Sequence, residues 1–280
     1  MKLRFPFLFL DLDGTLLNAQ KRISLSDYNA IRLYRSLGGR IFLASGRSPI
    51  SVEWIASCIG AEHSYIAFNG AHICVDCNLV YENIFEEDEV RFLYSLADEY
   101  NLECLAYTRD TMVLDQISNF SKRWIEQIIP LGYLESNHAR ISFQKKSNIV
   151  YRRDFHGLSS VLKIVVLPSN IEQYETFYKI LSGFSFQLNR TPRYIEITKR
   201  GSDKYTGLQK ILSHLNLSAK KAMSIGDNEN DYTMMKGTGF SVAVENATEE
   251  IKSISNAIVS SNNNNGVSEA INTYALTSED

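Results

Sequence analysis

The chain lacks any apolar run approaching the ~20 residues that an α-helix needs to cross a bilayer. It also lacks an excess of basic residues, since 29 Lys and Arg stand against 32 Asp and Glu and the net charge is -3. No basic stripe is present to neutralise nucleic-acid phosphates, so neither a membrane protein nor a nucleic-acid binder is expected. Asp11 and Asp13 interrupt the first apolar run too early for a signal peptide, and we expect a cytoplasmic, soluble protein.

Cysteine is scarce, with four among 280 residues. Cys74 and Cys77 form a lone CxxC with His72 just ahead, and no second CxxC exists to complete a zinc site. The segment alternates like a hairpin with its turn near residues 76–78. A metal or redox role remains an alternative, but reduced structural thiols are the interpretation that we favour.

Apolar residues are plentiful, at 44% of the chain, and the length suits one large or two modest domains. Strands and helices alternate over residues 1–82 and again over 189–280, which predicts a parallel sheet covered by helices on both faces. Hairpin-like strands and helices lie between them. We therefore expect an α/β fold with a Rossmann-like, doubly wound core, 1–82 plus 189–280, interrupted by an inserted α+β cap, 83–188.

The periodicity assigns the elements of both parts. The expected core strands are 7–10, 40–44, 65–68, 194–198, 222–225, 240–244 and 257–260, with an edge hairpin at 72–75 and 79–81. The expected core helices are 24–37, 49–59, 204–215, 230–235 and 247–254, with a final helix after 262–266. The expected cap strands are 102–107, 111–114, 161–167 and 184–188, and its helices are 86–100, 121–129 and 171–181.

Two carboxylates end the first expected core strand, in the run Asp11-Leu12-Asp13-Gly14-Thr15. Because alternate side chains of an extended chain share a side, Asp11 and Asp13 point together. Two such acids repel each other unless a cation or a shared proton lies between them. Gly14 lets the backbone turn away, and Thr15 offers a hydroxyl and an amide.

Three further polar segments fall where the expected strands meet loops, the edge of a parallel sheet at which ligands bind. Ser45, Gly46 and Arg47 close the second strand. Lys204 begins a helix after 201–203, and the acidic run 226–231 follows the strand at 222–225.

These residue types suit a phosphorylated substrate. The carboxylates of Asp11 and Asp227, with the backbone oxygen of Asp13, are suitable ligands for Mg²⁺, which would offset the repulsion between Asp11 and a phosphate dianion. Ser45 and Lys204 would bind the equatorial oxygens of the transition state.

The same carboxylates suit the chemistry of phosphoryl transfer. Asp11 could attack phosphorus and form an aspartyl-phosphate. Asp13 could protonate the leaving oxygen and later deprotonate water. Asp231, four residues after Asp227, is expected to orient Lys204 or the waters of the metal.

Taken together, the four segments in this order resemble the haloacid dehalogenase superfamily of phosphotransferases, and the insertion is similar to that of its Cof-like branch. The runs Phe68-Asn69-Gly70-Ala71, 244–247 and 262–267 share this resemblance. Position by position, it implies Asp11 as nucleophile, Asp13 as acid and base, and Asp11, Asp13, Asp227 and Asp231 at the Mg²⁺ site. It further implies a phosphate and substrate site built from Gly14, Thr15, Ser45, Gly46, Arg47, Asn69, Lys204 and Asn230.

The function expected on these grounds is a Mg²⁺-dependent phosphatase of small phosphorylated metabolites, with sugar phosphates preferred, whose cap sets specificity. A hexose phosphate phosphomutase of the same superfamily is the nearest alternative. A protein that binds such metabolites without turnover is another, since fold does not fix function. The sequence identifies neither the physiological substrate nor the oligomeric state.

Overall fold

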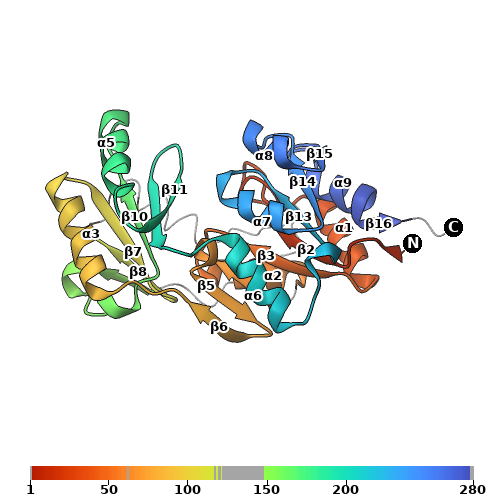
Figure 1. Cartoon of the computed structure of the whole chain (residues 1–280), viewed down its shortest axis with the longest axis horizontal. Coiled ribbons are helices and arrows are strands. Elements are labelled where there is room, and N and C mark those ends of the chain that lie inside the picture. Colours follow the sequence, from red (N-terminus) through yellow and green to blue (C-terminus); the bar gives the residue numbers. More distant parts are fainter. Residues whose placement is uncertain (1, 62, 117, 119–120, 122–147, 278–280) are drawn as a thin grey trace.

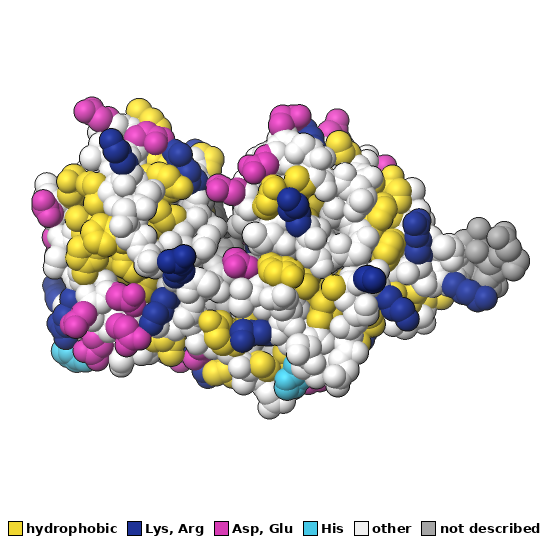
Figure 2. All heavy atoms as spheres, viewed as in Figure 1, with side chains coloured by type: hydrophobic (Ala, Val, Ile, Leu, Met, Phe, Trp, Pro, Cys, Tyr) yellow, Lys and Arg dark blue, Asp and Glu magenta, His cyan; other side chains and the backbone are white. Residues whose placement is uncertain are grey.

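The computed structural model describes residues 2–61, 63–116, 118, 121 and 148–277, which form two lobes (Figure 1). The larger lobe carries both ends of the chain, and the smaller lobe is the region between β6 and α6 (Figure 1). On the face drawn in Figure 2 a notch separates the two lobes.

An eight-stranded sheet forms the centre of the larger lobe, in the order β15-β14-β13-β2-β3-β4-β5-β6. All neighbours from β15 to β4 are parallel, and β4-β5-β6 continue antiparallel. These strands are β2 (Phe7–Leu10), β3 (Arg40–Ala44), β4 (Tyr65–Ala67), β5 (His72–Val75), β6 (Asn78–Glu82), β13 (Ala222–Gly226), β14 (Phe240–Val244) and β15 (Ala257–Val259). A short antiparallel pair, β1 (Lys2–Leu3) and β16 (Leu276–Thr277), joins the two ends of the chain.

The alternation of side chains along the strands explains why helices cover both faces of this sheet. Leu8 and Leu10 of β2 pack in one cluster with α1, α2 and α9, whereas Phe9 packs in another with α6. The helices are α1 (Leu25–Ser36), α2 (Pro49–Ile59), α6 (Lys204–His214), α7 (Tyr232–Gly237), α8 (Glu249–Ile254) and α9 (Gly266–Ala270). The predicted doubly wound α/β fold is confirmed.

The smaller lobe contains a six-stranded sheet in the order β11-β12-β10-β7-β8-β9. Its elements are α3 (Glu87–Glu99), β7 (Glu103–Tyr107), β8 (Thr111–Leu114), β9 (Asn148–Tyr151), β10 (Lys163–Leu167), α5 (Ile171–Leu181), β11 (Phe186–Arg190) and β12 (Ile195–Lys199). Both helices pack against one face of this sheet. Leu105, Tyr107 and Val165 on the other face cluster with Phe68 of the larger lobe.

One boundary of the sequence-based organisation requires correction. The sequence pattern predicts that the core resumes at residue 189 and that its next strand is 194–198. In the structure this strand is β12, which lies between β11 and β10 of the six-stranded sheet of the smaller lobe. A strand's own pattern does not specify its partners, so only the fold assigns it. We propose residue 200 as the approximate end of the inserted cap.

The two chain crossings between the lobes lie side by side. The amide of Asn83, just after β6, donates to the carbonyls of Lys199 and Arg200 at 3.3 and 3.0 Å, and to the hydroxyl of Ser202 at 2.9 Å. One side chain therefore joins the outgoing and returning segments.

Two other expectations have different outcomes. The helix expected at 121–129 lies outside the described residues except at its first position. The hairpin expected around the CxxC is present as β5 and β6. Burial raises the pKa of the Cys74 thiol to about 11, which disfavours the thiolate form.

None of the helices within the described ranges has the length and apolar character that a membrane span needs.

Gly70 allows the turn after β4 to pack closely against the start of α6. Its φ is +101°, and a Cβ at this position would overlap the backbone of Asp203, the residue that caps α6. This close approach places Asn69 and Lys204 in neighbouring elements.

We expect Gly70→Ala to destabilise the protein by about 1–3 kcal/mol more than Gly38→Ala, because both residues have positive φ but only Gly70 is crowded. Gly38 has φ +91° and nothing within 4 Å of its would-be Cβ, which makes it the matched control. Urea unfolding measures the difference. Equal losses in the two variants would show that the contact with Asp203 has no energetic weight.

Candidate active site

A cavity of about 240 Å³ lies at the carboxyl ends of β2, β3 and β13. Strand order reverses around β2, and in such sheets this point is the usual ligand site. Residues from both lobes line it: Asp11, Asp13, Lys21, Ser45, Gly46, Arg47, Ser48, Ser51, Phe68, Tyr107, Lys163, Thr191, Tyr194, Glu196, Asn228 and Asn230.

A buried lysine joins two of the predicted carboxylates. Lys204 is the first residue of α6, and its Nζ donates to Asp11 Oδ1 and to Asp231 Oδ1, both at 2.6 Å. Lys204 and Asp231 have no exposed surface and Asp11 has only 4%. Segments 193 and 27 residues away from Lys204 therefore converge on one ammonium group.

Charge and burial compete in this cluster. Burial raises the pKa of Asp11 to about 7, although the charge of Lys204 acts in the opposite direction. Burial lowers the pKa of Lys204, but the charges of Asp11 and Asp231 and their hydrogen bonds exceed this effect and raise it. The raised pKa favours the cationic form of Lys204 next to Asp11.

Asp227 completes an acidic group beside this lysine. Asp11, Asp227 and Asp231 each offer an oxygen, and these atoms lie within 4.8 Å of one another, the one such group within the described ranges. Burial, followed by the charges of Asp11 and Asp231, raises the pKa of Asp227 well above its usual value. Such crowding of carboxylates suits a divalent cation bound by oxygen ligands.

Gly14 and Thr15 form the contact between the first loop and Asp227. The hydroxyl of Thr15 donates to Asp227 Oδ1 at 2.9 Å. Gly14 has φ +91°, and a Cβ there would overlap the Asp227 carboxylate. Two asparagines support the same loop: Asn246 donates to the Gly14 carbonyl at 2.8 Å, and Asn262 donates to the Leu17 carbonyl at 2.8 Å. Gly14 and Thr15, which the sequence predicts as phosphate contacts, therefore contact the Asp227 carboxylate in the structure.

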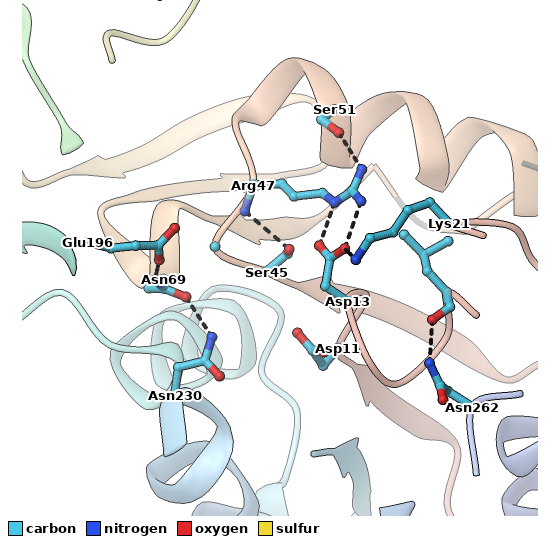
Figure 3. Close-up of polar contacts among 12 residues, drawn as sticks. Asp11, Asp13, Lys21, Ser45, Arg47, Ser51, Asn69, Glu196, Asn230 and Asn262 are labelled. Atoms are coloured by element: carbon cyan, nitrogen blue, oxygen red, sulfur yellow. Dashed lines mark hydrogen bonds and ion pairs between the residues drawn. The ribbon is translucent and has the colours of Figure 1, made fainter. Parts of the chain in front are cut away.

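Asp13 is in direct contact with two cations that also line the cavity (Figure 3). Arg47 binds both of its oxygens, with Nε at 2.6 Å and an NH₂ group at 2.8 Å, and Lys21 Nζ lies at 2.7 Å. Partial burial favours the neutral acid, but the charges and hydrogen bonds of Arg47 and Lys21 hold the pKa of Asp13 well below its usual range. Asp13 is therefore a carboxylate in this arrangement.

Asp231 and Ser45 are held by backbone groups. The Asp231 Oδ2 atom accepts from the amides of Asp227 and Asn228 at 3.0 and 3.2 Å, while its other oxygen accepts from Lys204. Asp231 is thus fixed between the two backbone amides and Lys204. Ser45 is 1% exposed, lines the cavity, and accepts from the Arg47 amide at 3.2 Å.

Asn69 and Asn230 connect the two lobes. Asn230 lines the cavity and donates to Asn69 Oδ1 at 3.0 Å, and Asn69 donates to Glu196 Oε2 at 2.8 Å (Figure 3). Asn69 itself is not among the described residues that line the cavity. Gly46 lies close to Asn69 and Glu196, since a Cβ at this position would come within 3.1 Å of Asn69 and 3.2 Å of Glu196.

Sequence reasoning missed three charged residues of the site: Lys21, Lys163 and Glu196. Lys21 lies eight residues after Asp13, in a turn that carries no chemical signature. Glu196 lies on the strand that was assigned to the wrong sheet, and Lys163 begins β10. No local pattern shows which strand residues face a cavity, and for Glu196 the sheet was also assigned incorrectly.

The sequence family model of the haloacid dehalogenase-like hydrolases matches residues 8–271 of this chain. The matched range contains every residue that lines the cavity. The chain belongs to the haloacid dehalogenase-like hydrolases. The resemblance inferred from the motifs is thereby confirmed.

Individual relatives are distant. The putative phosphatase YkrA of Bacillus subtilis is 25% identical, over 96% of this chain and 97% of its own length. Endoribonuclease YBEY of Arabidopsis thaliana chloroplasts is 27% identical over 98% of this chain, which spans only 47% of that longer protein. A solved HAD subclass IIB sugar phosphatase is 21% identical, covers 96% of this chain and 98% of its own, and superposes with a TM-score of 0.77. This structural likeness supports the fold.

Removal of the Lys204 charge is expected to destabilise the fold. Lys204→Met leaves Asp11 and Asp231 buried without their cation, a loss of about 3–5 kcal/mol near neutral pH. In the variant, burial raises the pKa of Asp11 in the folded chain above its unfolded value, and no ammonium group opposes this effect. The loss therefore shrinks as the pH falls toward the unfolded value of about 3.9.

Urea unfolding at several pH values measures this loss. The control is Lys179→Met, which removes an exposed lysine from α5. If the Lys204 variant and the control lose the same stability at every pH, the buried cluster does not depend on the lysine charge.

Proposed function

We propose that this protein is a Mg²⁺-dependent phosphatase that hydrolyses small phosphorylated metabolites, with sugar phosphates as the substrate class. One observation carries the proposal: Asp11 lines the cavity while its Oδ1 atom accepts from the buried Lys204 Nζ at 2.6 Å. A carboxylate nucleophile beside a fixed cation is the arrangement that phosphoryl transfer through an aspartyl-phosphate requires. Membership of a hydrolase family and the relative named as a putative phosphatase support the same reaction.

The first step forms a bond between an Asp11 oxygen and phosphorus, and breaks the bond between phosphorus and the leaving oxygen. Lys204, which contacts Asp11, and Ser45, which lines the cavity, would hold the phosphoryl oxygens, on which the transition-state charge is spread. In the second step water attacks phosphorus, which releases phosphate and restores the Asp11 carboxylate.

Asp13 has a different protonation requirement in each step. The carboxylate held by Arg47 and Lys21 suits the second step, in which a base takes a proton from water. The first step needs a protonated Asp13 to neutralise the leaving oxygen. The ion pairs with Arg47 and Lys21 must therefore rearrange before the leaving group departs.

The acidic group fits the Mg²⁺ ion that the reaction implies. Asp11 and Asp227, with the backbone oxygen of Asp13, would hold the ion, and Asp231 would act through Lys204 and the amides of Asp227 and Asn228. The ion would supply positive charge that offsets the repulsion between these acids and a phosphate dianion.

A phosphomutase is the alternative that this site leaves open, because it begins with the same attack by Asp11. It differs in that the phosphoenzyme returns its phosphate to a sugar instead of to water. Activation by a sugar bisphosphate, with little free phosphate released, would favour the phosphomutase.

Asp11→Asn is expected to lower kcat for hydrolysis of p-nitrophenyl phosphate by at least about a thousandfold, because the amide is a poor nucleophile. The variant keeps the size of the side chain and one oxygen for Lys204. Phosphate release is the measurement, and thermal unfolding shows whether the variant folds. Wild-type turnover by the folded Asn variant would remove Asp11 from the role of nucleophile.

Mg²⁺ is expected to stabilise the folded chain in the absence of substrate. At about 100 times its Kd the ion should contribute about 2.7 kcal/mol, seen as a higher Tm that EDTA reverses. Asp227→Asn should remove most of this shift, whereas Asp110→Asn, at an exposed position of the smaller lobe, should preserve it. An unchanged Tm in the wild-type protein would contradict the proposed ligand set.

A further inference from the structure

Two buried charged residues of the smaller lobe lie in the wall of the cavity. Lys163 of β10 and Glu196 of β12 lie on neighbouring antiparallel strands and form an ion pair. They are only 3% and 8% exposed. Both line the same cavity as Asp11, on the sheet face that packs against the larger lobe.

The pair also contacts the larger lobe. Lys163 Nζ donates to the carbonyl of Gly46 at 2.9 Å. Glu196 accepts from Asn69, which in turn accepts from Asn230 (Figure 3). Contacts with Gly46 and Asn69 therefore fix the pair against the larger lobe, and these contacts set its position relative to Asp11.

Stability alone does not account for this pair. Replacement of a buried ion pair by apolar residues of similar volume is often neutral or stabilising, so such a pair is weak grounds for a structural role. Its surroundings are those of a binding wall: the rings of Phe68 and Tyr107 lie 5.8 and 5.6 Å from Lys163 Nζ, and the cavity continues to Thr191 and Tyr194.

The chemistry of the wall limits what fits beside it. The two charges of the pair cancel, so the pair itself contributes no net charge that would attract an anion. A carboxylate has about four acceptor sites, and contacts from described residues use two of those on Glu196. Hydroxyl groups can donate to the remaining sites, and aromatic faces pack against C–H surfaces.

We propose that Lys163 and Glu196 are specificity-determining residues that select a neutral, polyhydroxylated leaving group, with Glu196 accepting hydrogen bonds from its hydroxyls. This inference rests on the proposed phosphatase function and names the part of the substrate beyond the phosphate. An anionic leaving group gains no net attraction from the ion pair, and its carboxylate has no hydrogen to donate to Glu196. A leaving group without hydroxyls leaves the buried carboxylate without donors, which is the arrangement that gives strong discrimination.

The test compares kcat/KM for two matched probes, sorbitol 6-phosphate and 6-phosphogluconate, which differ only in a terminal CH₂OH or carboxylate. The wild-type protein is expected to prefer sorbitol 6-phosphate. Glu196→Gln leaves the charge of Lys163 uncompensated and should lower this preference by about tenfold. Lys163→Met leaves the negative charge and should raise it by a similar factor. A purely structural effect lowers both rates and leaves their ratio unchanged.

A second variant covers the case in which a single substitution prevents folding. Lys163→Met with Glu196→Leu replaces the pair by apolar residues, which buried sites tolerate better than one unpaired charge. It should lower the preference for sorbitol 6-phosphate over hexyl phosphate, which lacks hydroxyls, by about tenfold. Glu175→Gln is the control, because it removes the partner of Arg190 on the exposed surface of the same lobe and should change neither ratio.

The outcomes separate this inference from the proposed function. Hydrolysis of p-nitrophenyl phosphate with no preference for sorbitol 6-phosphate, or ratios that the variants do not move, would overturn the inference and leave the phosphatase function standing. Absence of phosphate release from every probe would overturn both.

Discussion

The ammonium group of Lys204 is the interaction on which the site depends. Asp11, Asp227 and Asp231 would repel one another in a buried position, and Lys204 is the buried cation that hydrogen-bonds to two of them. The lysine is held at the first turn of α6, where the helix dipole does not favour a cation, so the carboxylates and not the helix supply its stabilisation. In the proposed reaction the same charge would also act on a phosphoryl group next to Asp11.

The parallel sheet makes this convergence possible. β2, β3 and β13 are neighbours with the same direction, so the residues that follow them reach the same edge although they are far apart in the sequence. Close packing then sets the distances: Gly14 admits the Asp227 carboxylate, and Gly70 admits the backbone of Asp203 just before Lys204. The absence of a side chain at these two glycines is as necessary to the site as the charged groups themselves.

The second lobe closes the cavity with side chains of a different character. The larger lobe supplies most of the charged groups of the lining, while the smaller one supplies the side chains of Tyr107, Thr191 and Tyr194 and the Lys163–Glu196 pair. Asn83 joins the two crossings, and Asn69 links both lobes beside the cavity. A ligand bound in this cavity would therefore contact residues of both lobes.

Local sequence determined most of the secondary structure and the predicted phosphate and metal residues. An apolar run that ends in polar residues indicates a buried strand and the position of its end, and this information lies within the run itself. It was enough to anticipate that Asp11, Lys204, Asp227 and Asp231 would meet. Tertiary structure alone decided that β12 belongs to the six-stranded sheet, that Asp13 is paired with Arg47 and Lys21, and that Glu196 faces the cavity. The physical reason is that strand partners and ion pairs depend on contacts between distant segments, which no stretch of sequence specifies by itself.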